Sequence, residues 1–316
     1  MLIGVAAILA ASPVCAQTTD QNGATDQNQT RDQNLAKCVT NDPDTVIDGC
    51  TGLIQSKQED AGNLMIYYYD RGNAYYSKHR YDEAIADFTQ AITLNPGFVD
   101  AYNSRGAANA ELGHYDEAIA DDTKTIELRP DAAVAYNNRG INYSHKGLDD
   151  PAIADYTHAI ALAPDFAEAY SRRGDAYIRE HRFDEAIADF SRTIALSPDI
   201  PFVYGNRGYA YGEQRRYDQG IADYTQALVL DPDYAEAYNG RAWEYHLKGD
   251  DARALPDAER AVTLAPKDAA SLETRAEIYE KLDQRDKAIA DYRASLLLDP
   301  QQSLAEDGLK RLGATP

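Results

Sequence analysis

The sequence lacks any stretch rich in lysine and arginine, and its 52 acidic residues outnumber its 31 basic ones, giving a formal net charge of −21 at pH 7. Nucleic acids and anionic membranes bind to clustered basic side chains, so both are disfavoured as partners. The acidic excess has two interpretations. It attracts a basic partner, or it forms a solvated outer face that keeps the chain soluble.

Catalytic and metal-binding motifs are missing as well. The sequence has no glycine-rich phosphate loop and no nucleophile elbow. Its six histidines are His79, His114, His145, His158, His181 and His246. No two of them have the i, i+4 spacing of a helical metal pair, and no column of carboxylates completes a ligand set. The sequence therefore predicts no enzyme activity, no cofactor and no metal site.

One apolar run, residues 1–16, carries no charge and ends in Val14-Cys15-Ala16. It is too short to span a bilayer comfortably and predicts a secretory signal peptide cleaved after Ala16, although no basic residue precedes it. A lipid-modified Cys15 is the alternative, but that chemistry favours a smaller residue than Val14 before the cysteine. The sequence thus predicts an exported, periplasmic protein without stable membrane insertion after cleavage.

Residues 17–34 are almost entirely Gln, Asn, Asp and Thr. Such a segment cannot bury enough apolar surface to fold, which predicts a disordered polar leader with order beginning near Leu35.

What the sequence does contain is a strict period of 34 residues. Arginine followed by glycine or alanine recurs at Arg71, Arg105, Arg139, Arg173, Arg207, Arg241 and Arg275. A period without insertions indicates one supersecondary unit stacked on copies of itself, so the chain should be a solenoid without a single globular core.

Other columns share this period. When the residue after each arginine is numbered 8, position 4 is Tyr in six of seven copies, position 20 is Ala or Gly, and position 32 is always Pro. The prolines are Pro96, Pro130, Pro164, Pro198, Pro232, Pro266 and Pro300. Over residues 65–302, seven copies of 34 residues, the pattern resembles the tetratricopeptide repeat family.

Apolar positions 4, 8 and 11, and then 20, 21, 24, 28 and 30, follow helical spacing and predict two amphipathic helices, A and B, in each repeat. Proline at position 32 ends helix B. The predicted fold is an all-α tetratricopeptide repeat superhelical solenoid of seven 34-residue helix-turn-helix repeats. Polar replacements at Asn109 and Asp122, and the small Ala258, predict looser packing where they occur.

Arginine at position 7 is matched by aspartate at position 23 in every repeat. Seven such pairs on adjacent antiparallel helices predict a repeated structural ion pair, within one repeat or between neighbours. Treated as exposed pairs, they would contribute only about 0–1 kcal/mol each.

Residues 35–64 form a degenerate N-terminal repeat in the same register. Cys38 falls at position 8 and Cys50 at position 20, the columns where the two helices come closest. An even pair of cysteines in an exported protein suggests a disulfide, which would contribute about 2–4 kcal/mol. Two buried free thiols are the alternative.

At the other end, residues 303–316 form a capping helix and tail. Helical spacing continues through Leu304, Leu309 and Leu312, with Gly313 after the last turn. A terminal helix of this kind covers the last repeat's apolar face.

In tetratricopeptide repeats the concave wall is formed by helix A, chiefly positions 2, 5, 6, 9, 12 and 13, and ligands are generally held there. The resemblance implies these partner-binding residues: Tyr69, Asn73, Tyr76, Asn103, Asn137, Asn138, Arg172, Arg179, Phe202, Asn206, Tyr209, Asn239, Trp243 and His246. Amides can donate to and accept from a peptide backbone, and clustered exposed aromatics are typical of binding hot spots. The alternatives are a local preference for polar residues near a helix start and aromatic packing between helices.

The sequence therefore predicts a non-catalytic protein–protein interaction scaffold that holds a peptide segment or protein partner in its concave groove, in the bacterial envelope. An architectural subunit of an envelope or secretion assembly, using its convex face or edges, is the first alternative. A metal carrier or enzyme using the groove histidines is the second.

Overall fold

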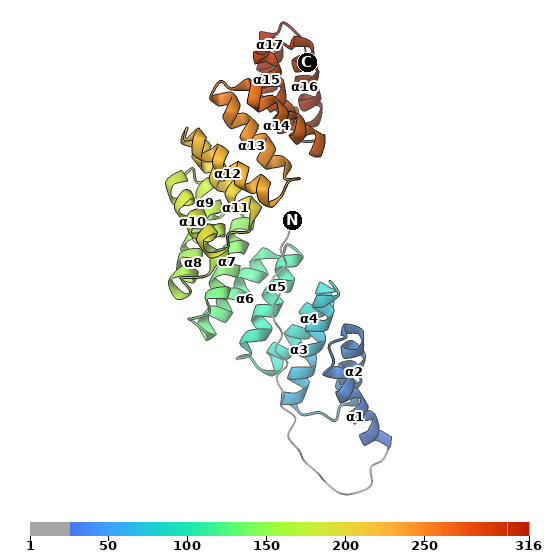
Figure 1. Ribbon diagram of the computed structural model, residues 1–316. Helices are drawn as coiled ribbons and strands as arrows, with labels where there is room; N and C mark the ends of the chain where they lie inside the picture. Colours follow the sequence, from blue (N-terminus) through green and yellow to red (C-terminus); the bar gives the residue numbers. More distant parts are fainter. Residues whose placement is uncertain (1–25, 302, 316) are drawn as a thin grey trace. The chain divides into compact units, whose positions relative to one another are not determined.

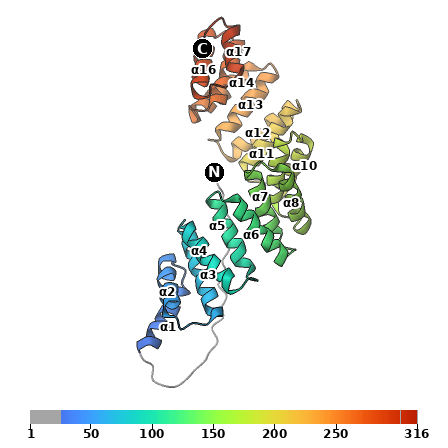
Figure 2. The ribbon, with the colours of Figure 1, turned by 180° about the vertical axis from the view of Figure 1, so that it is seen from behind.

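The computed structural model describes residues 26–301 and 303–315. The predicted signal peptide, residues 1–16, and the leader up to residue 25 lie outside this part. Within it all regular structure is α-helical: seventeen helices, α1–α17, and no strand. The chain divides into two compact units, residues 1–146 and 147–316, and each is described by itself. Figure 1 shows each unit as a row of helix pairs, and Figure 2 shows the same rows from behind.

The first unit holds seven helices: α1 Asp26–Cys38, α2 Pro43–Ser56, α3 Ala61–Ser77, α4 Tyr81–Leu94, α5 Val99–Glu111, α6 Tyr115–Leu128 and α7 Ala133–His145. The second unit holds ten: α8 Asp149–Leu162, α9 Ala167–Arg179, α10 Phe183–Leu196, α11 Pro201–Glu213, α12 Tyr217–Leu230, α13 Ala235–Leu247, α14 Asp251–Leu264, α15 Ala269–Lys281, α16 Arg285–Leu298 and α17 Ser303–Arg311. The predicted helix A and helix B of each repeat are confirmed.

The turn between helices A and B needs a left-handed residue at position 15. Glycine supplies it in some repeats, as at Gly113 and Gly249, with φ of 76° and 77°. Elsewhere a residue with a side chain adopts it, as at His79 and Arg215, with φ of 57° and 59°. Because a Cβ atom disfavours this conformation, the second group of turns is strained.

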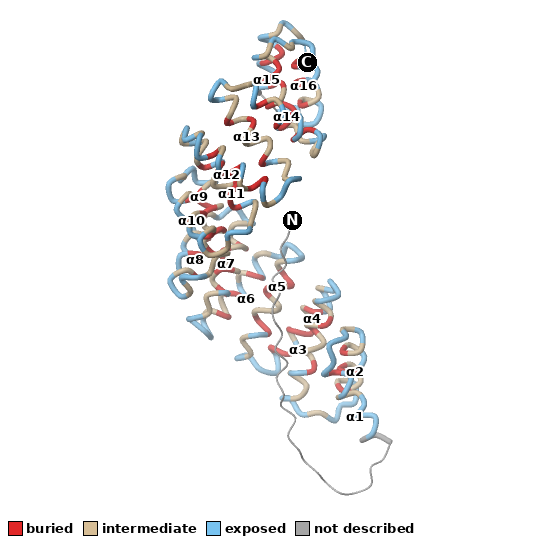
Figure 3. The backbone as a smooth tube through the Cα atoms, in the orientation of Figure 1, coloured by how far each residue is buried: buried red, intermediate tan, exposed pale blue. Residues whose placement is uncertain are grey.

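Small residues bring the two helices of a pair together. A Cβ atom on Gly72 would lie 2.7 Å from the Phe88 ring, and one on Gly174 would lie 2.8 Å from the Phe190 ring. Both rings are fully buried, as are the alanines at position 20 of the same repeats. The buried positions therefore recur along every helix pair instead of gathering at one centre (Figure 3).

Helix A contacts the next helix A within each unit, as in α3 with α5 and α11 with α13. In the described part of the chain no second helix of a repeat contacts the next second helix. A row in which one layer is closer together than the other curves toward the closer layer. Helix A therefore forms the inner side of each unit.

The predicted ion pairs form within single repeats, but they are not exposed. Arg207 donates from Nε and Nη2 to the two carboxylate oxygens of Asp223, at 2.7 and 2.8 Å. The same two-bond geometry recurs at Arg71–Asp87, Arg105–Asp121, Arg173–Asp189, Arg241–Asp257 and Arg275–Asp291. These aspartates are only 4–8% exposed, so the value expected for exposed pairs is wrong: removing one partner of a buried pair costs about 3–5 kcal/mol.

A third bond ties several of these pairs to the preceding repeat. Arg207 also donates from Nη1 to the Ser191 hydroxyl, at 3.0 Å, and Arg105 does the same to Thr89. The guanidinium of Arg207 also lies 5.9 Å from the Tyr204 ring centroid. Tyrosine at position 4 therefore covers the arginine it precedes, which adds a cation–π contact.

The polar replacement at Asp122 is buried and hydrogen-bonded. Its side chain is 1% exposed and accepts a hydrogen bond from Nδ2 of Asn142, at 2.9 Å. Asn109 is also buried and donates to Asp121 at 3.4 Å. Hydrogen-bonded polar side chains thus stand where other repeats have an aromatic ring, although Oδ1 of Asn142 is buried without a partner among the described residues.

Order at the N-terminus begins earlier than predicted. Helix α1 starts at Asp26, so the prediction of a disordered leader is wrong for residues 26–34. Although α1 is polar, it packs closely against α2: a Cβ atom on Gly49 or Gly52 of α2 would lie 2.4–2.6 Å from atoms of α1. Arg31 anchors the helix by donating to Glu59 at 2.6 and 3.0 Å. Glycines on α2 thus let a polar helix pack.

The two cysteines of this degenerate repeat form the predicted disulfide. Cys38 and Cys50 are bonded, with a Cα–Cα distance of 4.8 Å, and are 2% and 0% exposed. The bridge joins the end of α1 to the middle of α2.

At the other end, α17 covers the last repeat, and two of the three predicted leucines, Leu309 and Leu312, pack against it. Ala305 and Leu309 are fully buried, whereas Leu304 is 47% exposed. Gly308 makes the approach possible, because a Cβ atom there would lie 2.3 Å from the Tyr292 ring.

Candidate functional site

The inner wall of the second unit, formed by α9, α11, α13 and α15, presents aromatic side chains to solvent. Phe202 and Tyr209 on α11 are 37% and 44% exposed. Tyr209 is the more open of the two, and its ring lies edge-on to Phe183 with 6.4 Å between centroids. Large aromatic groups left exposed on an inner face are available to a partner.

Trp243 and His246 on α13 lie together, with ring centroids 5.3 Å apart. The imidazole is tied down from the other side, because its Nδ1 lies 2.5 Å from the Asp251 carboxylate. The His246 side chain is only 9% exposed. Little of the predicted His246 contact surface is therefore left for a partner.

Asn206 does not point freely into solvent. Its Nδ2 donates to Asp175 of α9 at 2.8 Å. Burial raises the pKa of Asp175 to about 6, while Arg172, Asn206 and Arg179 act in the opposite direction. The amide and the carboxyl group thus link neighbouring first helices.

The two predicted arginines have acidic neighbours. Arg172 lies 3.5 Å from Glu168 on its own helix, and Arg179 pairs with Asp149 at 2.6 Å. Both are available only through exchange of an existing ion pair.

In the first unit the predicted tyrosines pack against other rings. The Tyr69 centroid lies 4.8 Å from that of Phe98, and Tyr76 lies 5.3 Å from Tyr81. Burial, with the Glu111 charge, raises the pKa of Tyr76 to about 12. These rings are half-buried, so packing between helices accounts for most of their surface.

The asparagines are mostly engaged or covered. Asn138 donates to Asn103 at 3.5 Å. Asn137 is 2% exposed and therefore cannot present its amide to a partner, which corrects its assignment to the groove. Oδ1 of Asn239 is also buried, with no hydrogen-bond partner within the described residues. Asn73 is half-exposed and stays a candidate for contact with a partner.

The sequence analysis missed Glu244, at position 10 of α13. This side chain is 3% exposed, and its Oε2 has no hydrogen-bond partner within residues 26–301 and 303–315. Its Oε1 lies 2.0 Å from where a Cβ atom of Gly212 would be and 2.9 Å from that of Gly220. Burial, with the neighbouring Glu213 charge, raises the pKa of Glu244 to about 8. The sequence did contain a signal for this contact: glycine at positions 212 and 220, and in the following repeat a glutamate at position 10, where most repeats have alanine.

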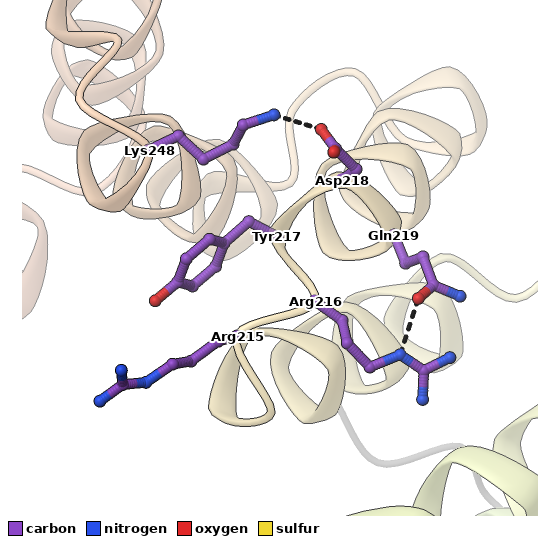
Figure 4. A pocket seen from close by; sticks show the side chains of 6 residues that line it. All are labelled: Arg215, Arg216, Tyr217, Asp218, Gln219 and Lys248. Carbon is purple, nitrogen blue, oxygen red and sulfur yellow. Dashed lines mark hydrogen bonds and ion pairs between the residues drawn. The ribbon is translucent and has the colours of Figure 1, made fainter.

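A shallow pocket lies at the turn between α11 and α12, away from the predicted residues (Figure 4). It is lined by Arg215, Arg216, Tyr217, Asp218, Gln219 and Lys248. Four of its polar groups are paired with one another: Lys248 pairs with Asp218, and Arg216 donates to Gln219 at 2.7 Å.

No group of His, Cys, Asp and Glu within the described residues is arranged to hold a metal ion. Among the same residues, no helix is both long and apolar enough to cross a membrane.

Paired helices in register, small residues between them and an inner wall of side chains define an all-α solenoid of the scaffold class. Models of the tetratricopeptide repeat match residues 133–166, 167–200, 201–234, 235–268 and 269–302, and a related repeat model matches 72–113. The chain is a tetratricopeptide repeat protein. Proteins built from these repeats are non-catalytic scaffolds for protein–protein interaction.

Solved structures show the same fold. A tetratricopeptide repeat protein from Parabacteroides merdae is 19% identical, with a TM-score of 0.61 over 79% of this chain and 98% of its own. MamA is 26% identical, with a TM-score of 0.51 over 55% of this chain and 96% of its own. YrrB, described as having an unusual peptide-binding site, is 21% identical, with a TM-score of 0.50 over 60% of this chain and 97% of its own. No curated protein sequence matches the chain.

Proposed function

We propose that this protein is an exported scaffold that holds a peptide segment of a partner protein on the inner wall of its second unit. The observation that carries the proposal is the exposure of Phe202 and Tyr209 on α11, a first helix that contacts the first helices on both sides of it, α9 and α13. Exposed aromatic side chains supply large contact area at low cost in conformational entropy.

Export is supported by the Cys38–Cys50 bridge, because structural disulfides persist in oxidising compartments. The apolar segment at residues 1–16 is consistent with this location. Sequencing the N-terminus of the protein from a periplasmic extract tests the proposal, with Gln17 as the expected first residue. Recovery of the chain only from the cytosol, with its cysteines reduced, would contradict it.

Affinity capture from an envelope extract tests the wall. The parent chain is compared with a variant carrying Tyr209→Ala, Trp243→Ala and His246→Ala, after circular dichroism shows equal helicity. A matched control carries the same number of substitutions to alanine on exposed outer residues. A partner that the parent and the control retain, and that the wall variant loses, is the expected result. Equal retention by all three would place the contact on the convex face or an edge, in favour of the architectural function.

A further inference from the structure

Position 9 of successive first helices forms a row across the inner wall of the second unit. The row reads Asp175 on α9, Tyr209 on α11, Trp243 on α13 and Glu277 on α15. These helices contact one another in turn, and packed helices lie about 8–10 Å apart. Two aromatic side chains are therefore flanked by carboxyl groups on both sides.

A further carboxylate lies next to the more exposed ring. Glu213 follows Tyr209 by one helical turn and is exposed. Burial, together with the nearby Glu213 charge, raises the pKa of Tyr209. The arginines of α11 and α13 cannot neutralise Glu213, because Arg207 and Arg241 are engaged in their buried ion pairs. Glu213 is exposed and lies beside the Tyr209 hydroxyl, whereas Glu277 is paired with Arg311 at 2.8 Å.

Glu244 adds a carboxyl group next to Glu213, but it is buried, and burial raises its pKa to about 8, so it offers no charge to a partner at neutral pH. It projects from α13 to Gly212, the residue immediately before Glu213, and one of its oxygens is buried without a partner among the described residues. The carboxyl groups of Glu213 and Glu244, from neighbouring helices, are close enough for the Glu213 charge to help raise the pKa of Glu244.

Tyr209 is exposed, Trp243 is half-buried and Glu213 is an exposed carboxylate. Aromatic faces and carboxylates bind arginine and lysine side chains by cation–π attraction and ion pairing. We propose that the wall of α11 and α13 binds an extended basic peptide, with an arginine or lysine side chain lying on Tyr209 and Trp243 and paired with Glu213. The inference rests on the proposed function and names its partner class. The net charge of −21 favours the approach of such a partner.

Fluorescence anisotropy with three labelled decapeptides tests the inference on the full mature chain. All three have a Gly-Ser backbone, and they carry two arginines, two glutamates or no charge. The arginine peptide is expected to bind best, and its affinity should fall as salt is raised. Glu213→Gln should weaken it at least fivefold, and Tyr209→Ala with Trp243→Ala should do the same.

The matched control is Asp150→Asn, which removes one acidic charge from an exposed position at the start of α8. It should change the affinity less than twofold. If Glu213→Gln and Asp150→Asn weaken binding of the arginine peptide equally, the overall charge of the protein explains the binding, and the inference is overturned. Equal or tighter binding of the neutral or glutamate peptide would also overturn it. If the wall variant still loses its partner in the capture experiment while Glu213→Gln does not, the groove function stands and only the basic preference falls.

Discussion

Glu244 places its carboxyl group where the side chain of any residue other than glycine at position 212 would have to lie. A Cβ atom on Gly212 would lie 2.0 Å from Oε1 of Glu244, and one on Gly220 would lie 2.9 Å from the same oxygen. The two helices of one repeat, α11 and α12, therefore both have glycine at the place where α13 of the next repeat inserts the Glu244 side chain.

The first prediction concerns the pH dependence of stability. The pKa of Glu244 is about 8 in the folded protein, above the ordinary value near 4.3 for an unfolded glutamate. Between these values the folded state binds more protons, so the contribution of this group to stability is greatest at low pH and falls by about 1.4 kcal/mol for each unit of rising pH. Glu244→Gln should remove this loss, as measured by urea midpoints at pH 5 and pH 8. Equal loss in both proteins would contradict the assignment.

The second prediction is a coupling between the two residues. Gly212→Ala should lower the free energy of unfolding by about 1–3 kcal/mol, because its methyl group overlaps the Glu244 carboxyl. In a Glu244→Ala background the same change should be neutral or stabilising by up to about 1 kcal/mol, since alanine favours a helix. A double-mutant cycle by urea denaturation measures the difference. A cost that is unchanged in the second background would show that the two groups do not meet.

The third prediction concerns the buried ion pairs. Asp223→Ala leaves the guanidinium of Arg207 half-buried without its two-bond partner. We expect a loss of about 3–5 kcal/mol in the free energy of unfolding. The comparison is Glu185→Ala, which breaks the exposed pair with Arg182. If the urea midpoint shifts as far for Glu185→Ala as for Asp223→Ala, burial does not increase the contribution of the Arg207–Asp223 pair to stability, and the prediction is wrong.

The fourth prediction concerns the turns. Arg215 adopts φ of 59°, a conformation that glycine occupies without strain. Arg215→Gly should raise the thermal midpoint, with a gain of about 0.5–1 kcal/mol once the greater freedom of glycine in the unfolded chain is subtracted. Gly249→Arg is the matched reverse change, because φ there is 77° and nothing lies within 4 Å of its Cβ site. It should lower the midpoint through backbone strain alone, and an increase would count against this explanation.

The fifth prediction concerns the disulfide. Cys38→Ser with Cys50→Ser should cost the N-terminal repeat about 2–4 kcal/mol. Amide hydrogen exchange should become faster in α1 and α2, whereas α11 and α13 should keep their protection, because each repeat contacts only its neighbours. Unchanged exchange in α1 would mean that the contact of Arg31 with Glu59 suffices.

The repeat pattern was enough to place the helix pairs, their register and their order along the chain. Period 34, small residues at positions 8 and 20, and proline at position 32 are local signals, and each is repeated seven times. The pairing of Cys38 with Cys50 agrees with the same register, which places them at positions 8 and 20, the columns where the two helices of one repeat come closest.

Which of these residues are covered depended on tertiary contacts. Asn137 is buried and Tyr209 exposed, although both stand at inner-wall positions, because the neighbouring helix sets how much room remains. The aspartate of each ion pair is buried for the same reason. The polar composition of residues 26–34 wrongly predicted disorder there, because glycines on α2 allow the polar helix α1 to pack against it. Exposure is set by contacts between repeats, and a pattern read along one repeat does not contain them.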